Sequence, residues 1–170
     1  MPEPNGVTLP SDVKPTRYDL TLAPNLDDFT FRGRETVEIE VVEPTSTITL
    51  HCIEIAIQSC LLFSENNGYR TPVDTRFDED SETVTFVFDS EVPRGTARLE
   101  IEFTGELNDK LRGFYRSKYT DADGNDKYLA TTQFEATDAR RAFPCWDEPS
   151  IKARFKVTML TPSDLATVSN

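Results

Sequence analysis

The sequence predicts a mainly β fold, in which largely antiparallel, curved sheets enclose one core. Short runs of residues alternate between apolar and polar side chains with a period of two. Such alternation is typical of strands with one face on a core and the other in water. Residues that favour turns separate the runs. No long amphipathic pattern of helical period is present, so two packed or strongly curved sheets are expected.

The expected strands follow a polar, proline-rich leader that ends at Pro15 and should lie over the surface. They cover residues 17–22, 37–41, 47–52, 84–88, 99–103, 128–135 and 151–160. The expected turns cover residues 23–25, 43–45, 66–68, 92–95 and 123–125. Helical structure is limited to one short helix near Thr137–Ala142, which Pro144 would close.

Length and composition indicate one soluble globular β domain over residues 1–170. Hydrophobic residues make up 37% of the chain and charged residues 28%, which suits a folded domain of this size. The net charge of −12 disfavours nucleic acid and anionic membranes as partners, because both repel an acidic surface. Attraction to cationic ligands, such as peptides with a free amine, is a weaker interpretation of the same charge.

The three cysteines, at positions 52, 60 and 145, form no CxxC pair. Their odd number and irregular spacing favour reduced, buried thiols over disulfides or a thiolate zinc site. The N-terminus lacks the apolar segment of a signal peptide, and no apolar run approaches the ~20 residues of a membrane helix. A cytoplasmic protein is therefore expected.

Several sets of polar residues resemble functional sites, but the sequence favours an ordinary structural role for each. Residues 121–126 are acidic like a calcium loop, yet the glycine and the twelfth residue do not fit that pattern, and Asp-Gly favours a hairpin turn. His51 is the sole histidine and is expected on a sheet face or at the surface. Glu35, Glu38 and Glu40 are expected to form a solvated strand face. The chain contains no catalytic residue set and no metal site by these criteria.

Gln133 and Glu135 are the strongest candidates for a binding role. If residues 128–135 form a strand, these two polar side chains share one face and Phe134 points into the core. An ordinary polar strand face would explain the pair equally well. The dense segment ARRAFPCWDEP follows directly, with arginines 140 and 141 able to clamp carboxylates such as Asp138, Asp147 or Glu148. Such a rigid turn could hold a binding pair in place or could simply stabilise the fold.

The segment TQFEATDARRAFPCWDEP, with IKARFKVTM after it and GELNDKLRGFYRSKY before it, resembles the N-terminal domain of the M1 (gluzincin) zinc aminopeptidases. The similarity spans almost the whole chain and is greatest to the puromycin-sensitive branch of that family. It implies a saddle-shaped, mostly antiparallel β domain that sits against a thermolysin-like catalytic domain. By the resemblance, Glu135 would bind the free α-amine of a peptide substrate, and Gln133 would line the pocket for its first side chain.

The motifs that the family uses for catalysis, HExxH and GAMEN, are missing from these 170 residues. The resemblance therefore implies that zinc belongs to a full-length enzyme, and that this chain is a truncated N-terminal domain that binds no zinc and is inactive alone. Two other functions stay open. M1-like chains that have lost the zinc site act as scaffolds, although the Gln133–Glu135 pair disfavours that role here. A carbohydrate-binding β-sandwich is disfavoured because the chain has one tryptophan.

Overall fold

The computed structural model describes residues 8–65 and 67–169, and it confirms a mainly β fold built from three sheets. In chain order the strands are β1 (Val13–Asn25), β2 (Thr30–Val41), β3 (Thr45–His51), β4 (Ile55–Ser64), β5 (Gly68–Arg70), β6 (Asp74–Asp78), β7 (Thr83–Val92), β8 (Gly95–Glu106), β9 (Gly113–Thr120), β10 (Asp126–Gln133) and β11 (Arg154–Met159).

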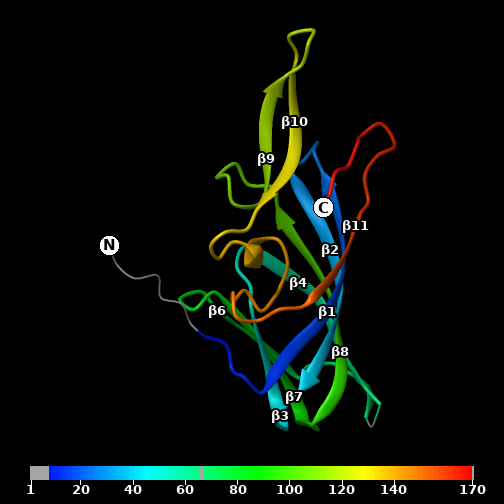
Figure 1. Ribbon diagram of the computed structural model, residues 1–170, viewed down its shortest axis with the longest axis vertical. Coiled ribbons are helices and arrows are strands. Elements are labelled where there is room, and N and C mark those ends of the chain that lie inside the picture. Colours follow the sequence, from blue (N-terminus) through cyan, green and yellow to red (C-terminus); the bar gives the residue numbers. More distant parts are fainter. Residues whose placement is uncertain (1–7, 66, 170) are drawn as a thin grey trace.

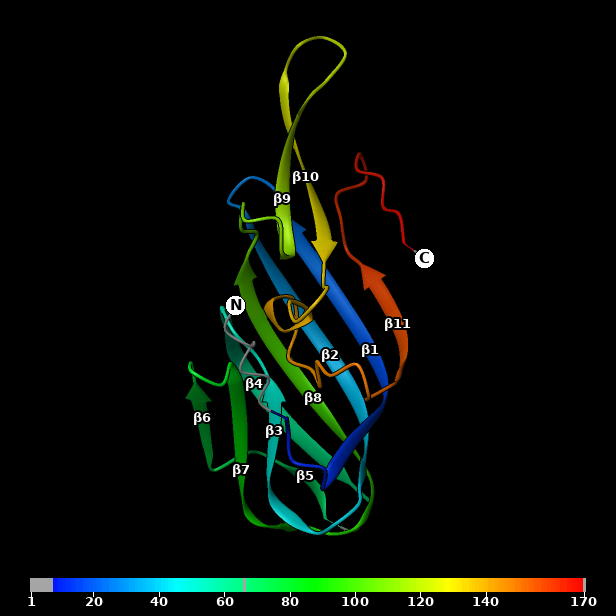
Figure 2. The same cartoon turned by 60° about the vertical axis from the view of Figure 1, so that its left-hand side comes forward.

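The largest sheet has six strands in the order β11-β1-β2-β8-β4-β5. The strand β11 runs parallel to β1, and the remaining neighbours are antiparallel. Inward residues alternate with outward ones along its central strands, as the period of two predicted. The sheet is long and strongly twisted in both ribbon views (Figures 1 and 2).

A three-stranded sheet, β3-β7-β6, supplies the other side of the core. Inward side chains from both sheets belong to one hydrophobic cluster, in which Val37 and Leu99 of the larger sheet join Leu50 and Phe86 of the smaller one. All four are fully buried. Burial of apolar area between two sheets is the main source of stability in such a fold.

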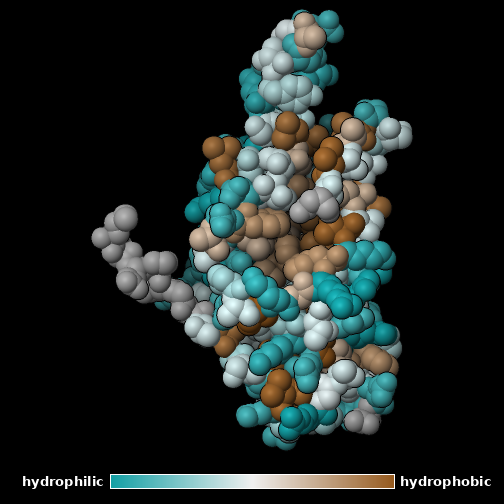
Figure 3. Space-filling model, in the orientation of Figure 1, coloured by the Kyte–Doolittle hydropathy of each residue, from teal (hydrophilic) through white to brown (hydrophobic). Residues whose placement is uncertain are grey.

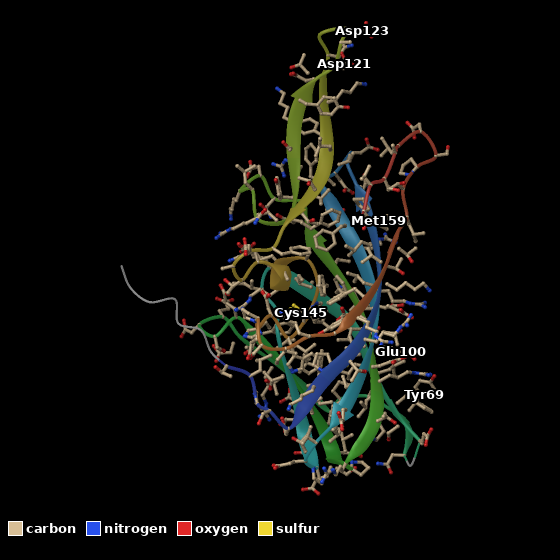
Figure 4. All side chains as sticks on the ribbon, viewed as in Figure 1. Tyr69, Glu100, Asp121, Asp123, Cys145 and Met159 are labelled. Carbon is tan, nitrogen blue, oxygen red and sulfur yellow. The ribbon has the colours of Figure 1, made fainter. Side chains whose placement is uncertain are left out.

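The third sheet is a hairpin of β9 and β10 that projects beyond the rest of the molecule (Figure 1). Asp121 and Asp123 lie at its tip, far from the core (Figure 4). The Asp121 carboxylate accepts hydrogen bonds from the backbone N–H groups of Asp123 and Asn125, at 3.0 and 2.8 Å. The Asp121 side chain therefore closes the turn. The hairpin turn itself was predicted from the sequence.

Helical structure among the described residues amounts to a 3₁₀ turn at Ala139–Arg141, inside the predicted 137–142 segment. None of the helices in this part of the chain has the length and hydrophobicity required to cross a bilayer.

Residues 23–25 belong to β1 rather than to the expected turn, which instead covers residues 26–29. The leader was expected to lie over the surface, but residues 1–7 fall outside the described residues; Leu9, further along, is buried.

Two predictions about polar residues were wrong. Glu35 was expected on a solvated strand face, but its exposed fraction is 0%. It points inward from β2, because inward and outward residues alternate along this strand and Glu35 is in phase with Phe31 and Val37. His51 was expected on a sheet face or at the surface. It does lie on a strand, β3, but the surface position is wrong, because His51 is buried where the smaller sheet meets the segment after β10.

The three cysteines are free and buried. Burial raises the pKa of the Cys52 and Cys60 thiols to about 12, and it also raises the pKa of Cys145. We expect iodoacetamide at pH 8 to label all three thiols at least about a hundredfold more slowly in the native chain than in urea, because the thiolate is the nucleophile. Mass spectrometry of timed samples measures the rates. Native labelling at the unfolded rate would contradict the buried positions.

Candidate functional site

The candidate pair lies where β10 ends. The strand stops at Gln133, which pairs with Gly113 of β9. Glu135 lies in the turn that follows, so the predicted strand 128–135 is two residues too long. The chain turns because the backbone N–H of Asp138 donates to the carbonyl of Phe134 at 2.9 Å. Strand pairing therefore positions Gln133, whereas the turn positions Glu135.

Gln133 and Glu135 are both exposed, and Phe134 between them is half-buried. The Phe134 ring packs edge-on against Phe143, with centroids 6.0 Å apart, and this confirms its predicted role as an anchor to the core. The Gln133 side-chain amide donates to the Glu135 backbone carbonyl at 3.5 Å. The Glu135 carboxylate therefore stands in solvent on a short segment whose central residue is fixed.

Residues 138–147, which we call the brace, follow this turn in the chain. They include two buried arginines, Arg140 and Arg141. Arg140 has a side-chain exposed fraction of 8%. Its guanidinium donates to Asp147 through Nε and to Glu82 through Nη1, both at 3.0 Å. Since Glu82 precedes β7, Arg140 ties the brace to the smaller sheet. Charge-assisted bonds of this kind are among the stronger hydrogen bonds in proteins.

Arg141 makes a second set of ionic contacts from the same 3₁₀ turn. Its guanidinium lies 2.8 Å from Asp138, 2.8 Å from Glu54 and 3.5 Å from Glu82. Glu82 therefore bridges both arginines. The predicted partners Asp138 and Asp147 are confirmed, whereas the Glu148 carboxylate accepts the backbone N–H of Leu9 at 2.7 Å instead.

Sequence reasoning missed Glu54 and Glu82 as partners of the brace. They are more than fifty residues away from the arginines along the chain, and nothing in their local pattern marks them. Both adopt left-handed backbone conformations, with φ of 59° and 53°. Such φ values are uncommon for residues with a side chain. The backbone beside them also contacts the brace, because Ile53 N–H donates to the Arg140 carbonyl at 3.1 Å.

The far end of the brace is anchored in the core. Cys145 and His51 exchange backbone hydrogen bonds at 2.8 and 3.0 Å, and Cys145 lies near the middle of the molecule (Figure 4). The backbone N–H of Trp146 donates to the Tyr18 hydroxyl at 3.3 Å, and the backbone N–H of Asp147 donates to His51 Nδ1 at 3.2 Å. Buried hydrogen bonds at this end and ion pairs at the other hold the brace as one rigid segment.

A pocket of about 230 Å³ opens beside the brace, next to Glu135 but not lined by it. Four aromatic residues belong to its walls: Tyr18 and Phe155 stack with centroids 4.6 Å apart, and Phe143 and Trp146 are the other two. The acidic residues Asp147 and Glu148 line it as well. Figure 3 shows hydrophobic side chains gathered in the middle of this face. Glu135 therefore precedes a residue, Ala136, that lines a partly aromatic pocket.

No group of three or more histidine, cysteine, aspartate or glutamate side chains within residues 8–65 and 67–169 is arranged to hold a metal ion. The described residues therefore provide no ligand set for a catalytic zinc ion. What the site offers is one exposed carboxylate, one neighbouring amide and a partly aromatic pocket beside them. These groups can bind and orient a cationic ligand, but they include no nucleophile or general base that is positioned against a second catalytic group.

Comparison with known proteins was made against protein-family models and curated sequences. The model of the peptidase M1 N-terminal domain matches residues 14–170. Aminopeptidase 2 of Candida albicans is 47% identical over 163 residues, which cover 95% of this chain and 17% of the relative. Aminopeptidase M1-C of rice (Oryza sativa subsp. japonica) is 43% identical over 162 residues, with 95% and 18% covered. The puromycin-sensitive aminopeptidase of Caenorhabditis elegans is 40% identical over 162 residues, with 95% and 17% covered.

Two consequences follow from these matches. The puromycin-sensitive branch is not singled out, because the Candida aminopeptidase 2 is more similar to this chain than the Caenorhabditis enzyme is. The chain also spans about 17% of the length of these relatives. The matches therefore assign the chain to a family without assigning it the activity of those longer proteins.

Proposed function

The chain belongs to the peptidase M1 N-terminal domain family, and from that membership we propose that it is the substrate-recognising domain of a longer zinc aminopeptidase, which removes N-terminal residues from peptides. Glu135 binds the α-ammonium group of the substrate, and Gln133 contacts the first side chain. One observation carries the proposal: these two side chains are exposed together where β10 ends and a turn begins, next to a segment that two buried arginines hold in place.

A fixed carboxylate suits an enzyme that must find the end of a peptide. The α-amine has a pKa of ~8 and is largely charged near neutral pH, whereas an internal peptide bond offers no cation. A carboxylate at a set position therefore selects the chain end and sets its distance from the bond to be cut. An amide beside it can orient the substrate without adding charge. The rigid brace keeps both groups in position before the substrate arrives.

The remaining parts of the activity lie outside this chain. Zinc would be held by the catalytic domain of the longer enzyme, which is also the proposed partner of the face that carries Glu135, and the 170-residue chain itself would neither hold zinc nor cleave peptides. Neither nucleic acid nor a membrane is part of the proposal. The proposal also places the protein in the cytoplasm. Its three free, buried thiols support this location, because cytosolic proteins keep their cysteines reduced.

The test is Glu135→Gln in the longer enzyme, a change that keeps the shape of the side chain and removes its charge. We expect kcat/KM for free-amine peptides to fall by about ten- to a hundredfold, because a charge-assisted hydrogen bond in a desolvated site contributes roughly 1.5–3 kcal/mol. Gln133→Ala should instead change the ranking of substrates by their first side chain, with a smaller average loss. Aminoacyl-anilide kinetics measure both effects.

Two controls separate binding from folding. Glu91→Gln alters an exposed glutamate on β7 and should leave kcat/KM unchanged. The melting temperature of the 170-residue chain should be the same with Gln or Glu at position 135, since surface substitutions are usually within ~0.5 kcal/mol. An unchanged kcat/KM, or a melting temperature lowered as much as by loss of a buried arginine, would assign Glu135 to the fold instead.

A further inference from the structure

Glu35 occupies a position in the core that the strand pattern reserves for an apolar side chain. It lies on the inward face of β2, in phase with Phe31 and Val37. Its cross-strand neighbours are Leu20 of β1 and Ile101 of β8, both buried. The exposed fraction of Glu35 is 0%. The centre of the six-stranded sheet therefore contains a carboxyl group that has no access to water.

Neither carboxyl oxygen of Glu35 has a hydrogen-bond partner in the described part of the chain. An isolated carboxylate in an apolar interior is very costly, so a buried acid takes up a proton instead. Burial accordingly raises the pKa of Glu35 well above its ordinary value, and no other cause contributes. The protonated form is also polar, but its burial costs much less than that of the charge.

Four acids with shifted pKa values sense the charge of Glu35. They are Tyr18 of β1, Cys52 directly after β3, Cys60 of β4 and Cys145 of the brace, and a negative charge on Glu35 raises the pKa of each. No lysine or arginine acts on Glu35 in return. Two of these acids, Cys52 and Cys145, are the chain neighbour and the backbone partner of the buried base His51, and Tyr18 links the group to the brace through its bond to Trp146.

We propose that Glu35 is a pH-sensitive element of the fold: it is protonated in the native domain, and its ionisation at higher pH loosens the core beneath the brace. The direction follows from proton counting. In the unfolded chain a glutamate loses its proton near pH ~4.3, whereas folded Glu35 keeps it to a higher pH. Between the pKa of glutamate in the unfolded chain and the higher pKa of Glu35 in the folded chain, the native state binds one more proton than the unfolded state. The free energy of unfolding therefore decreases as the pH rises through this interval.

The size of the effect is set by that single proton. The equilibrium constant for folding should fall by up to about tenfold for each pH unit, and so by up to about a thousandfold between pH 5 and pH 8. Hydrogen bonds lower the pKa values of Asp78 and Asp121, so their contribution is lost only as the pH falls below ~4. In the unfolded chain a histidine titrates near pH ~6.5 and thiols near pH ~8.5, so the contribution of Glu35 is read as the difference in slope between wild type and a variant at position 35.

The experiment is urea unfolding of the 170-residue chain at several pH values from 5 to 8.5, followed by the fluorescence of Trp146 and by circular dichroism. Wild-type protein and Glu40→Gln, which alters an exposed glutamate of the same strand, should both lose stability as pH rises. Glu35→Gln and Glu35→Met carry no ionisable group at position 35, so the loss of stability that Glu35 causes should be missing from both, and their slope against pH is the contribution of the other groups. Both variants should exceed wild type at pH 8.

A spectroscopic measurement covers the case in which the Glu35 variants do not fold. Wild-type protein at pH 7 should show the infrared carbonyl band of a protonated carboxyl group, and a ¹³C-labelled glutamate side chain should give one resonance that titrates far above the rest. Wild-type stability that does not fall relative to that of Glu35→Gln from pH 5 to pH 8 would overturn the proposal. The absence of a protonated carboxyl group at pH 7 would overturn it too.

Discussion

Replacement of Arg140 by alanine should lower the free energy of unfolding by about 3–5 kcal/mol, the usual result of removing one partner from a buried ion pair. The Arg140 side chain has an exposed fraction of 8%, and that of Asp147 is 13%. Without the guanidinium, Asp147 and Glu82 would keep their charges in a site with little water. Urea unfolding at neutral pH, followed by circular dichroism, measures the loss.

A surface ion pair provides the matched control. Arg17 and Asp19 lie 2.9 Å apart, but their side chains are 39% and 43% exposed, and such pairs typically contribute less than ~1 kcal/mol. Arg17→Ala should therefore have a small effect. A double-mutant cycle with Glu82→Gln should also reveal coupling between Arg140 and Glu82. Equal losses for Arg17→Ala and Arg140→Ala would show that the brace does not depend on its buried charges.

Gly113→Ala should lower the free energy of unfolding by about 2–5 kcal/mol. Its φ of +69° is left-handed, which costs other residues about 1–2 kcal/mol. A Cβ atom there would lie 2.6 Å from the Cβ of Arg141 and 3.3 Å from the backbone oxygen of Asp138, and such overpacking costs a further ~1–3 kcal/mol. Thermal and urea unfolding of the 170-residue chain measure the change.

The turn of the β9–β10 hairpin separates these two contributions. Gly124 also has a positive φ, +85°, but a Cβ there would meet nothing within 4 Å. Gly124→Ala should therefore show only the backbone cost of about 1–2 kcal/mol. Because Gly113 pairs with Gln133, Gly113→Ala should reduce activity in the longer enzyme together with stability. Equal costs at the two glycines would mean that Gly113 and Arg141 are not in close contact.

Much of the fold could be predicted from the sequence because its signals are local. Alternation with a period of two is a property of the strand itself, and it located parts of seven strands. The strands that were missed, β4, β5, β6 and β9, are short or lack clear alternation: the continuous segment IAIQSCLLFS in β4 is an example. Register and sheet order depend on pairing between distant segments, and the alternation within one strand does not encode them.

The candidate site could be predicted in part. Gln133 and Glu135 stood out by their position before a rigid segment, and their exposure agrees with a binding role that stays a prediction. The partners of the two arginines could be predicted where they are close in sequence, as for Asp138 and Asp147. Glu54 and Glu82 could not, since a guanidinium can pair with any carboxylate that the fold brings within reach.

By itself the sequence determined the β class, most of the strand positions, the turn at the hairpin tip and the segment on which function is proposed. Only the tertiary structure decided which polar residues are buried. Alternation assigns Glu35 to one face of β2 and Glu38 and Glu40 to the other, but which face meets the second sheet depends on contacts formed far along the chain. His51 is buried for the same reason, because the brace returns to pair with it.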